Sequence, residues 1–342
     1  MTAATGQPAD LAATGQPAVH AAPDLPAVHA ATARSADPDA GRLVGLTIRP
    51  AAPADAEPIY RLIAACELDL DGAAEVDPDD IVADLARPSR HLDRDTVLVH
   101  DPAGELVGWG QVTQGGRGEA DVRPDHRDRG IGRWLLGWTE RQAGELGATQ
   151  VGQMITDHNA AAAELFRSHG YQVKDTAWIL EIPLPTEPSV PEPPAGITVR
   201  TFRPGVDDRA VHQLIDEAFC EWPGRAPCPY DEWAALTIGR ETFAPDLSPL
   251  AVAGDRIVGV ALSLDLQNDD EGYVHQLAVH RDHRHRGIAR VLLRHAFAGF
   301  HRTGRRACCL STNSYTGALA LYERVGMRIR RSYSRYAREL PG

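Results

Sequence analysis

The sequence predicts a mixed α/β fold that occurs twice in tandem, and an internal repeat is the first reason. Residues 122–136 (VRPDHRDRGIGRWLL) align with residues 279–293 (VHRDHRHRGIARVLL), with ten identities in fifteen positions. Residues 164–171 align with residues 320–327 at almost the same offset. A constant offset through two separated segments indicates a duplicated domain rather than a chance motif.

Composition supplies the domain boundaries within the 342 residues. Residues 1–44 are rich in Ala, Pro and Thr without apolar periodicity, which predicts a disordered tail. Six prolines fall between residues 183 and 196, so residues 185–196 are expected to form an extended linker. The predicted domains are therefore residues 45–184 and 197–340.

Each half shows the same order of elements. Alternating apolar residues predict strands, a period near 3.6 predicts helices, and Gly and Pro mark the turns between them. In the first half we expect a strand at 46–50, helices at 55–70 and 79–87, a hairpin over 96–112, a strand ending at 122, a helix at 130–146, a strand at 149–156, a helix at 159–169 and further strands. In the second half we expect a strand at 197–202, helices at 207–219 and 230–239, a hairpin over 250–264, a strand at 273–279, a helix from 287, a strand at 306–311, a helix at 316–325 and terminal strands. This order predicts helices packed on a twisted mixed sheet.

The repeated motif is a loop between a strand and a helix, R-D-R-G-I-G at 127–132 and R-H-R-G-I-A at 284–289. The first amides of a helix have no intrahelical partner, and the helix dipole places partial positive charge there. Small residues in the first turn let an anion approach these amides, which predicts a pyrophosphate site. The flanking arginines are expected to add charge-assisted hydrogen bonds.

The array LAV-x₄-R-x-x-G-I-A-x-x-LL, followed by ALALYERVGM, resembles the acyl-CoA signature of the GNAT (GCN5-related N-acetyltransferase) superfamily. The resemblance covers residues 46–184 and 197–340, and it implies two GNAT folds in tandem that use acetyl-CoA as co-substrate. Tandem families such as the mycothiol synthases have a similar arrangement, although no motif points to mycothiol synthase itself. The implied acetyl-CoA contacts are Leu277, Ala278, Val279, Arg284, His285, Arg286, Gly287, Ile288, Ala289, Asn313 and Ser314 in the C-terminal copy, and Arg127, Arg129, Gly130, Ile131, Gly132 and Asn159 in the N-terminal copy.

The resemblance also distinguishes the two copies. The family often places a tyrosine late in the second helix of the signature, where its hydroxyl can protonate the departing CoA thiolate. That residue is Tyr322 in the C-terminal copy, whereas Phe166 at the equivalent place cannot donate a proton. The N-terminal copy keeps the family asparagine at Asn159, and the C-terminal copy has Ser314 there with Asn313 beside it. We therefore expect a catalytic C-terminal domain and a degenerate N-terminal one.

Direct transfer needs a base for the acceptor ammonium, and the candidates on the strand EGYVHQLAV are Glu271 and His275. His275 stands two residues before Leu277, so both are expected on one face of the sheet. Trp222, Tyr230 and Trp233 are candidates for an aromatic acceptor loop, with ordinary packing as the alternative. The acids Glu217, Glu221, Asp231 and Glu232 suit a cationic acceptor, but solvated helix faces explain them more simply.

The formal net charge of −12 argues against a general nucleic-acid binder. No stretch is long and apolar enough for a membrane span and no secretory signal is evident, so a cytoplasmic location is expected. We expect a small-molecule primary amine as acceptor and no metal, because arginines crowd the histidines of both loops; a homodimer is left open. The alternatives are an acyl-CoA-binding protein that does not catalyse transfer and a protein-lysine acetyltransferase.

Overall fold

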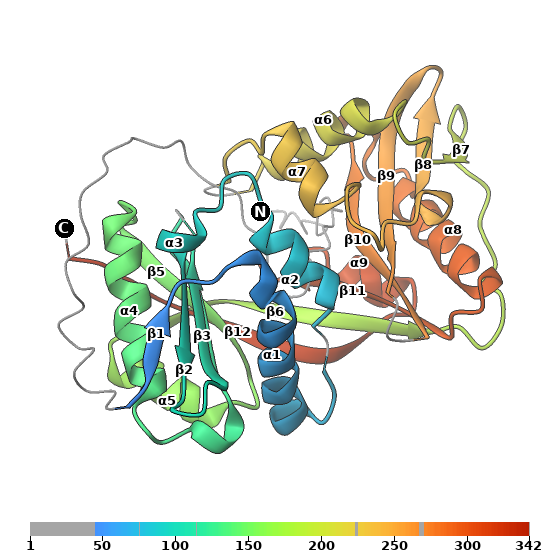
Figure 1. Cartoon of the computed structure of the whole chain (residues 1–342). Coiled ribbons are helices and arrows are strands. Elements are labelled where there is room, and N and C mark those ends of the chain that lie inside the picture. Colours follow the sequence, from blue (N-terminus) through green and yellow to red (C-terminus); the bar gives the residue numbers. More distant parts are fainter. Residues whose placement is uncertain (1–44, 75, 114, 223–224, 267–269, 342) are drawn as a thin grey trace, which may run out of the picture. The chain divides into compact units, whose positions relative to one another are not determined.

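The computed structural model describes residues 45–341 except 75, 114, 223–224 and 267–269 (Figure 1). The tail expected at residues 1–44 lies outside the described residues. The chain divides into two compact units. We call residues 45–176 with 333–341 the N-terminal unit, and residues 177–332 the C-terminal unit.

The N-terminal unit is a mixed sheet with the strand order β1-β2-β3-β4-β5-β12. Neighbouring strands are antiparallel except β4 and β5, which are parallel. The elements are β1 (Thr47–Arg49), α1 (Ala56–Asp71), α2 (Pro78–Leu85), α3 (Leu92–Asp95), β2 (Thr96–His100), β3 (Leu106–Val112), β4 (Arg117–Val122), α4 (Ile131–Glu145), β5 (Gln150–Thr156), α5 (Ala160–Ser168) and the end of β12 (Arg328–Glu339).

The C-terminal unit repeats this sheet with the strand order β6-β11-β10-β9-β8-β7. Its parallel pair is β10 with β11. The elements are the end of β6 (Gln172–Pro183), β7 (Thr198–Thr201), α6 (Asp208–Phe219), α7 (Tyr230–Leu236), β8 (Pro249–Ala253), β9 (Arg256–Asp265), β10 (Glu271–Val279), α8 (Ile288–Arg302), β11 (Ala307–Asn313), α9 (Leu319–Arg324) and the start of β12. The mixed α/β class and the predicted order of elements are confirmed.

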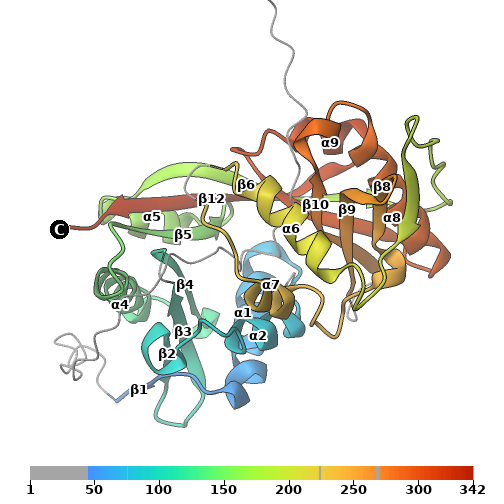
Figure 2. The same cartoon turned by 90° about the horizontal axis from the view of Figure 1, so that it is seen from above.

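Helices cover both faces of each sheet, because the strands are apolar on both sides. In β8, Leu250 and Val252 pack against α6, whereas Ala251 between them packs against α8. In β2, Leu98 faces α1 and α2, while its two valine neighbours face α4. Figure 2 shows α6 and α8 on the two sides of the β8–β10 strands. Continuous apolar strands are typical of sheets buried on both faces.

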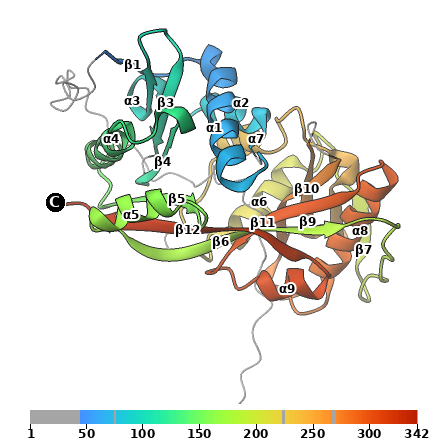
Figure 3. The same cartoon turned by 90° about the horizontal axis from the view of Figure 1, so that it is seen from below.

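The last strand of each repeat ends in the sheet of the other unit. The end of β6 pairs with β11, from Ala177↔Asn313 to Pro183↔Ala307. The end of β12 pairs with β5, from Tyr333↔Thr156 to Glu339↔Gln150 (Figure 3). The boundary expected at residue 184 therefore describes the sequence repeat, whereas the compact units exchange their final strands. Residues 184–197, which the structure describes in full, contain no helix or strand, as a proline-rich linker requires.

Candidate active site

The two parallel strands at the centre of the C-terminal unit run together and then separate. Their pairing ends at Tyr273 and Cys309, whereas β10 continues to Val279. A bulge falls at His275, where the pairing of β10 with β9 shifts register. Beyond Tyr273 the edge of β10 that faces β11 lies outside the described ladder, so its backbone groups can pair with an extended ligand. Leu277, Ala278 and Val279 lie on this stretch, as the sequence implied.

The loop after β10 turns sharply into α8. Gly287 caps the helix with φ 80°, and His285 is also left-handed with φ 61°. A left-handed conformation is unfavourable for a residue with a Cβ, so the surrounding structure must hold the backbone of His285 in this shape. No side chain caps α8, which leaves the amides of the first turn, at Ile288 and Ala289, available to an anion. This geometry suits a pyrophosphate.

The N-terminal unit has the same loop. Gly130 caps α4 with φ 87°, Asp128 is left-handed with φ 62°, and no side chain caps the helix. Ile131 is buried, as Ile288 is in the other copy, and Gly132 follows in the first turn. Both loops therefore have the backbone of an anion site, and the sequence repeat is a repeat of conformation as well.

The arginine side chains of the C-terminal loop, which were expected to add charge to the anion site, contact other groups of the protein. Arg284 forms a bidentate ion pair with Glu221, at 2.6 and 3.1 Å, and its Nε donates to the Val279 carbonyl. Arg286 donates to the Ala195 carbonyl. In the structure these guanidiniums contact a carboxylate and backbone carbonyls, and the amides of the first turn of α8 are left open to a phosphate.

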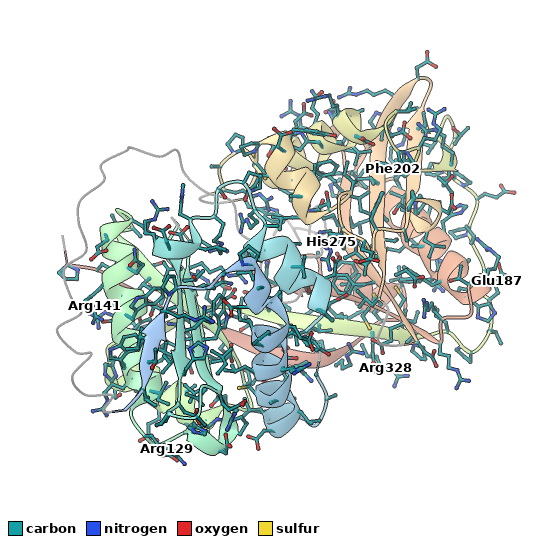
Figure 4. The ribbon with its side chains drawn as sticks, in the orientation of Figure 1. Arg129, Arg141, Glu187, Phe202, His275 and Arg328 are labelled. Atoms are coloured by element: carbon teal, nitrogen blue, oxygen red, sulfur yellow. The ribbon has the colours of Figure 1, made fainter. Side chains whose placement is uncertain are left out.

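The corresponding arginines of the N-terminal unit are engaged in the same manner. Arg127 pairs with Asp69 at 2.6 Å, and Arg129 donates to the Asp125 carbonyl. Arg129 lies on the outer surface of its unit, in contrast to the interior position of His275 in the C-terminal unit (Figure 4). The first arginine of each motif thus ties its loop to the segment at the end of the first long helix.

Tyr322 lies in α9 and is fully buried. Its hydroxyl has no hydrogen-bond partner among the described residues. Burial, with a smaller effect of the Tyr273 phenol, raises the pKa of Tyr322 well above its ordinary value of 10. The phenol is therefore protonated at neutral pH, and within the described part of the chain no group accepts its proton.

Asn313 ends β11 with only 2% of its surface exposed, and its Oδ1 also lacks a partner among the described residues. Ser314 beside it is exposed. Of the two residues at the family asparagine position, Asn313 is thus the one that turns a buried acceptor inward. Such orphaned buried atoms are rare, and a bound ligand is one of their ordinary explanations.

His275 is 1% exposed and faces α7, where it contacts the Leu236 backbone and the charge of Arg240. Burial and the Arg240 charge lower the pKa of His275 to about 3, and its Nδ1 has no partner among the described residues. Leu277 packs toward α8 instead. The expectation that both side chains share one face is wrong, because His275 is itself the extra residue of the bulge.

Glu271 lies at the closed end of the strand separation. Nη1 of Arg330 donates to both of its carboxylate oxygens, at 2.8 and 2.9 Å, and the Cys309 thiol donates to Oε2 at 3.0 Å. About a fifth of the Glu271 side chain is exposed, at 22%. The carboxylate is held in place and still reaches solvent.

At the equivalent position of the N-terminal unit, Phe166 is buried between Tyr171, at 4.9 Å, and Tyr336, at 5.5 Å between ring centroids. Asn159 accepts a hydrogen bond from the Ala162 amide and caps α5. The N-terminal copy therefore has an aromatic cluster and an occupied asparagine oxygen where the C-terminal copy has a free phenol and an orphaned amide oxygen.

Two family models match the chain, the acetyltransferase (GNAT) family over residues 210–327 and an acetyltransferase (GNAT) domain over residues 93–173. The chain belongs to the GNAT acetyltransferases. As a member of this family it is an acyl-CoA-dependent N-acyltransferase with two GNAT domains, and both the resemblance and the fold expected from the sequence are confirmed.

Similar proteins support this assignment. The mycothiol acetyltransferase of Salinispora tropica is 31% identical over 315 residues, covering 85% of this chain and 95% of that protein. The mycothiol acetyltransferase of Geodermatophilus obscurus is 31% identical over 252 residues, covering 67% and 78%. A GCN5-related N-acetyltransferase structure from Sphaerobacter thermophilus has 33% identity and a TM-score of 0.69, covering 87% and 97%. A tandem GNAT protein from the clavulanic acid biosynthesis pathway, at 18% identity and a TM-score of 0.66, shares the fold.

The aromatic residues of the expected acceptor loop divide into two groups in this GNAT protein. Trp233 is buried and donates to Oε1 of Gln276, so it fastens α7 to β10. Tyr230 packs beside Trp233, with ring centroids 6.0 Å apart. Trp222 is less buried and contacts Tyr315, which follows β11, at 5.8 Å between ring centroids. Packing explains the first two, and Trp222 is the one placed near the separated strands.

The sequence pattern suggested that the acids of the same segment lie on solvated helix faces. Two of them do not. Glu221 is the partner of Arg284, and Glu232 is buried with 6% exposed. The Arg284–Glu221 pair was missed in the sequence, because nothing in the spacing connects a residue after α6 with the loop after β10. Its counterpart, Arg127 with Asp69, has a different separation along the chain.

A surface cavity of about 610 Å³ lies elsewhere in the C-terminal unit, between α6 and the β8–β9 hairpin. Its charged lining is internally paired: Arg200 binds Asp207 in a bidentate ion pair, and Arg256 contacts His280 at 2.7 Å. Tyr322, Asn313 and His275 do not line it. Separately, among the described helices none combines the length and apolar character needed to cross a bilayer.

Proposed function

We propose that the C-terminal unit transfers an acetyl group from acetyl-CoA to a primary amine of a small molecule. One observation carries this proposal. Three buried polar atoms without described partners, the Tyr322 hydroxyl, Asn313 Oδ1 and His275 Nδ1, come from the strands and helix that flank the separation of β10 and β11. A buried polar atom left without a partner is costly, so three such atoms on the elements around the strand separation favour a polar ligand there.

The proposed chemistry is direct transfer. The neutral amine attacks the thioester carbonyl carbon, the new C–N bond forms, and the C–S bond breaks. Tyr322 gives its proton to the departing thiolate, and the proton lost by the nitrogen restores the phenol through water. The products are the amide and CoA with a free thiol. Backbone amides of β10 past the bulge are suited to stabilise the developing oxyanion.

Glu271 is the better of the two candidate bases. With a pKa of about 3, His275 is neutral at pH 7 but too weak a base to take a proton from an ammonium group. Its Nδ1 can still accept a hydrogen bond from the attacking amine and orient it. Glu271 is partly exposed, so it can remove the ammonium proton through a water molecule.

The test compares Tyr322→Phe with the reciprocal change Phe166→Tyr in the full chain. Free thiol release from acetyl-CoA is followed with a panel of small amines. We expect Tyr322→Phe to lower kcat by about 10–100-fold and Phe166→Tyr to leave it unchanged. An unchanged kcat in Tyr322→Phe would remove the phenol from the mechanism, and turnover confined to a lysine-peptide panel would replace the small-molecule acceptor.

The proposal for the N-terminal unit is different. Its loop has the same left-handed residues and uncapped helix, but Phe166 has no proton to give. We propose that it binds acyl-CoA without transferring the acyl group. Calorimetry with CoA should then show two sites on a chain that has one catalytic centre.

A further inference from the structure

Arg225 stands out among the arginines of the C-terminal unit. Its guanidinium carbon lies 4.6 Å from the ring centroid of Phe219 and 5.2 Å from that of Trp222. These two rings are stacked, at 4.7 Å and 14°. The guanidinium therefore lies within cation–π range of both rings of the stacked pair.

This guanidinium has no carboxylate partner among the described residues, and its Nε is buried without a hydrogen bond. Other arginines of the same unit are paired, as Arg200 is with Asp207 and Arg330 with Glu271. The charge of Asp216 acts on Arg225, but Oδ1 of Asp216 already accepts a hydrogen bond from the Cys228 amide. A desolvated cation without a counter-charge is costly unless an anion arrives.

The segment with Arg225 is attached to both flanks of the strand separation. On one side Glu221 is held by Arg284 of the anion-binding loop after β10. On the other side Trp222 contacts Tyr315, two residues beyond the end of β11. Arg225 is therefore positioned beside the opening between β10 and β11, where both substrates of an acyltransferase must enter.

We propose that Arg225 binds an oxyanion carried by one of the substrates, either a carboxylate of the acceptor amine or a phosphate of CoA. The guanidinium plane suits both, because it presents a fork of N–H donors that matches two oxygens. This inference rests on the proposed function of the C-terminal unit and deepens it. If the oxyanion is a carboxylate of the acceptor, the acceptor class is amines that also have a carboxylate.

The experiment uses the full chain with Arg225→Gln, which removes the charge, and Arg225→Lys, which keeps the charge without the fork. Arg209→Gln is the matched control, because Arg209 also lies over a ring, that of Tyr230 at 4.3 Å, but is exposed on α6. The acceptor arm compares α-amino acids with their C-terminal amides. The cofactor arm compares acetyl-CoA with acetyl-pantetheine, which has no phosphate.

If the oxyanion belongs to the acceptor, Arg225→Gln should raise KM for the amino acids by about 10–100-fold and leave KM for the amides unchanged. If it belongs to CoA, the affinity for acetyl-CoA should fall by a similar factor and that for acetyl-pantetheine should not. Arg225→Lys should recover part of either loss, and Arg209→Gln should show neither. Equal effects on charged and uncharged partners, or no effect in both arms, would overturn the anion site.

The outcome separates this inference from the proposed function. If the wild-type chain acetylates no amine, the proposed function fails, and the anion site is then tested by titrating inorganic phosphate into the wild type and Arg225→Gln with calorimetry. Heat of binding in the wild type that disappears in the variant supports the site. Identical titrations reject it. Circular dichroism of each variant shows that the fold is retained before either arm is interpreted.

Discussion

The two units share a loop but not a proton donor. Both cap the helix after the central strand with a left-handed glycine preceded, two positions earlier, by a left-handed residue that has a Cβ. In the C-terminal unit this loop accompanies the buried Tyr322 in α9, whereas at the corresponding place of the N-terminal unit Phe166 packs between Tyr171 and Tyr336. The two copies thus share the backbone geometry of this loop but differ in the side chain at the position of Tyr322.

The largest expected effect is loss of folding of the C-terminal unit when the chain is truncated after β6. A fragment of residues 197–342 lacks the end of β6, and with it Leu180, Ile182 and Leu184 of the C-terminal core. We expect it to aggregate, because β11 loses its neighbour and its edge is exposed. A fragment of residues 177–342 should be soluble and bind acetyl-CoA. Size-exclusion chromatography and circular dichroism would compare them, and equal folding of the two would mean that the borrowed strand is dispensable.

The second effect distinguishes the two anion loops. Replacing Gly287 with Val puts a β-branched residue at φ 80°, a conformation that Gly adopts without steric strain and Val does not. This change should distort the amides of the loop. We expect kcat/KM for acetyl-CoA to fall by about 100-fold, the loss of one or two charge-assisted hydrogen bonds. Gly130→Val should leave turnover intact and remove one CoA from the stoichiometry measured by calorimetry. Loss of turnover in Gly130→Val instead would make the N-terminal loop part of catalysis.

The third effect is a pH dependence of stability that arises from a histidine of the C-terminal unit. Gly118 occupies the aligned place of His275, so the N-terminal copy lacks this buried imidazole. The folded pKa of His275, about 3, lies below its ordinary value of 6.5, so the unfolded chain binds the proton first as the pH falls. Stability is therefore lost between about pH 6.5 and pH 3. From pH 7 to pH 5 the loss should be about 2 kcal/mol.

Urea unfolding at these two pH values measures that loss. The His275→Leu variant should show a pH-dependent drop smaller by the same amount, although it starts from a lower stability. An identical drop in the wild type and the variant would assign the acid sensitivity to other buried groups.

The smallest effect concerns the two arginine–acid pairs. Glu221→Gln removes a partly exposed charge from the pair with Arg284, whose side chain is 10% exposed, and loosens the segment that includes Trp222 and Arg225. We expect the acceptor KM to rise by about 3–10-fold, the size of a modest ion pair. Asp69→Asn, the matched change in the N-terminal unit, should alter no kinetic constant. A rise in both variants would show that the two loops act together.

Much of the fold could be predicted, because each element has its own local pattern. The repeated R-x-x-G motif and the apolar strand before it gave the loop, and Tyr322 was separated from Phe166 by alignment of the two halves. What could not be predicted depends on non-local pairing. The bulge at His275 changes the face of a side chain without a sequence signal, and the Arg284–Glu221 pair joins residues that no pattern connects. The position of Arg225 beside the strands also depends on non-local contacts, those of Glu221 with Arg284 and of Trp222 with Tyr315.

The strand exchange lies furthest from sequence patterns. Residues 177–183 alternate like any final strand and give no sign of which sheet they join. A hydrophobic pattern sets which face of a strand is buried, but it does not choose between two equivalent edges. Two repeats of one fold present such equivalent edges, so only the structure shows the choice.

The exchanged strands also bear on how the first copy would persist in the gene if, as proposed, it does not catalyse acyl transfer. The codons for residues 177–183 belong to the first repeat, yet their product pairs with β11 in the sheet of the C-terminal unit. Mutations that abolish chemistry in the first copy leave that contribution intact, whereas deletion of the copy removes it. Under the proposed division of roles, selection on the activity of the second repeat would therefore preserve the folding of the first without constraining Phe166.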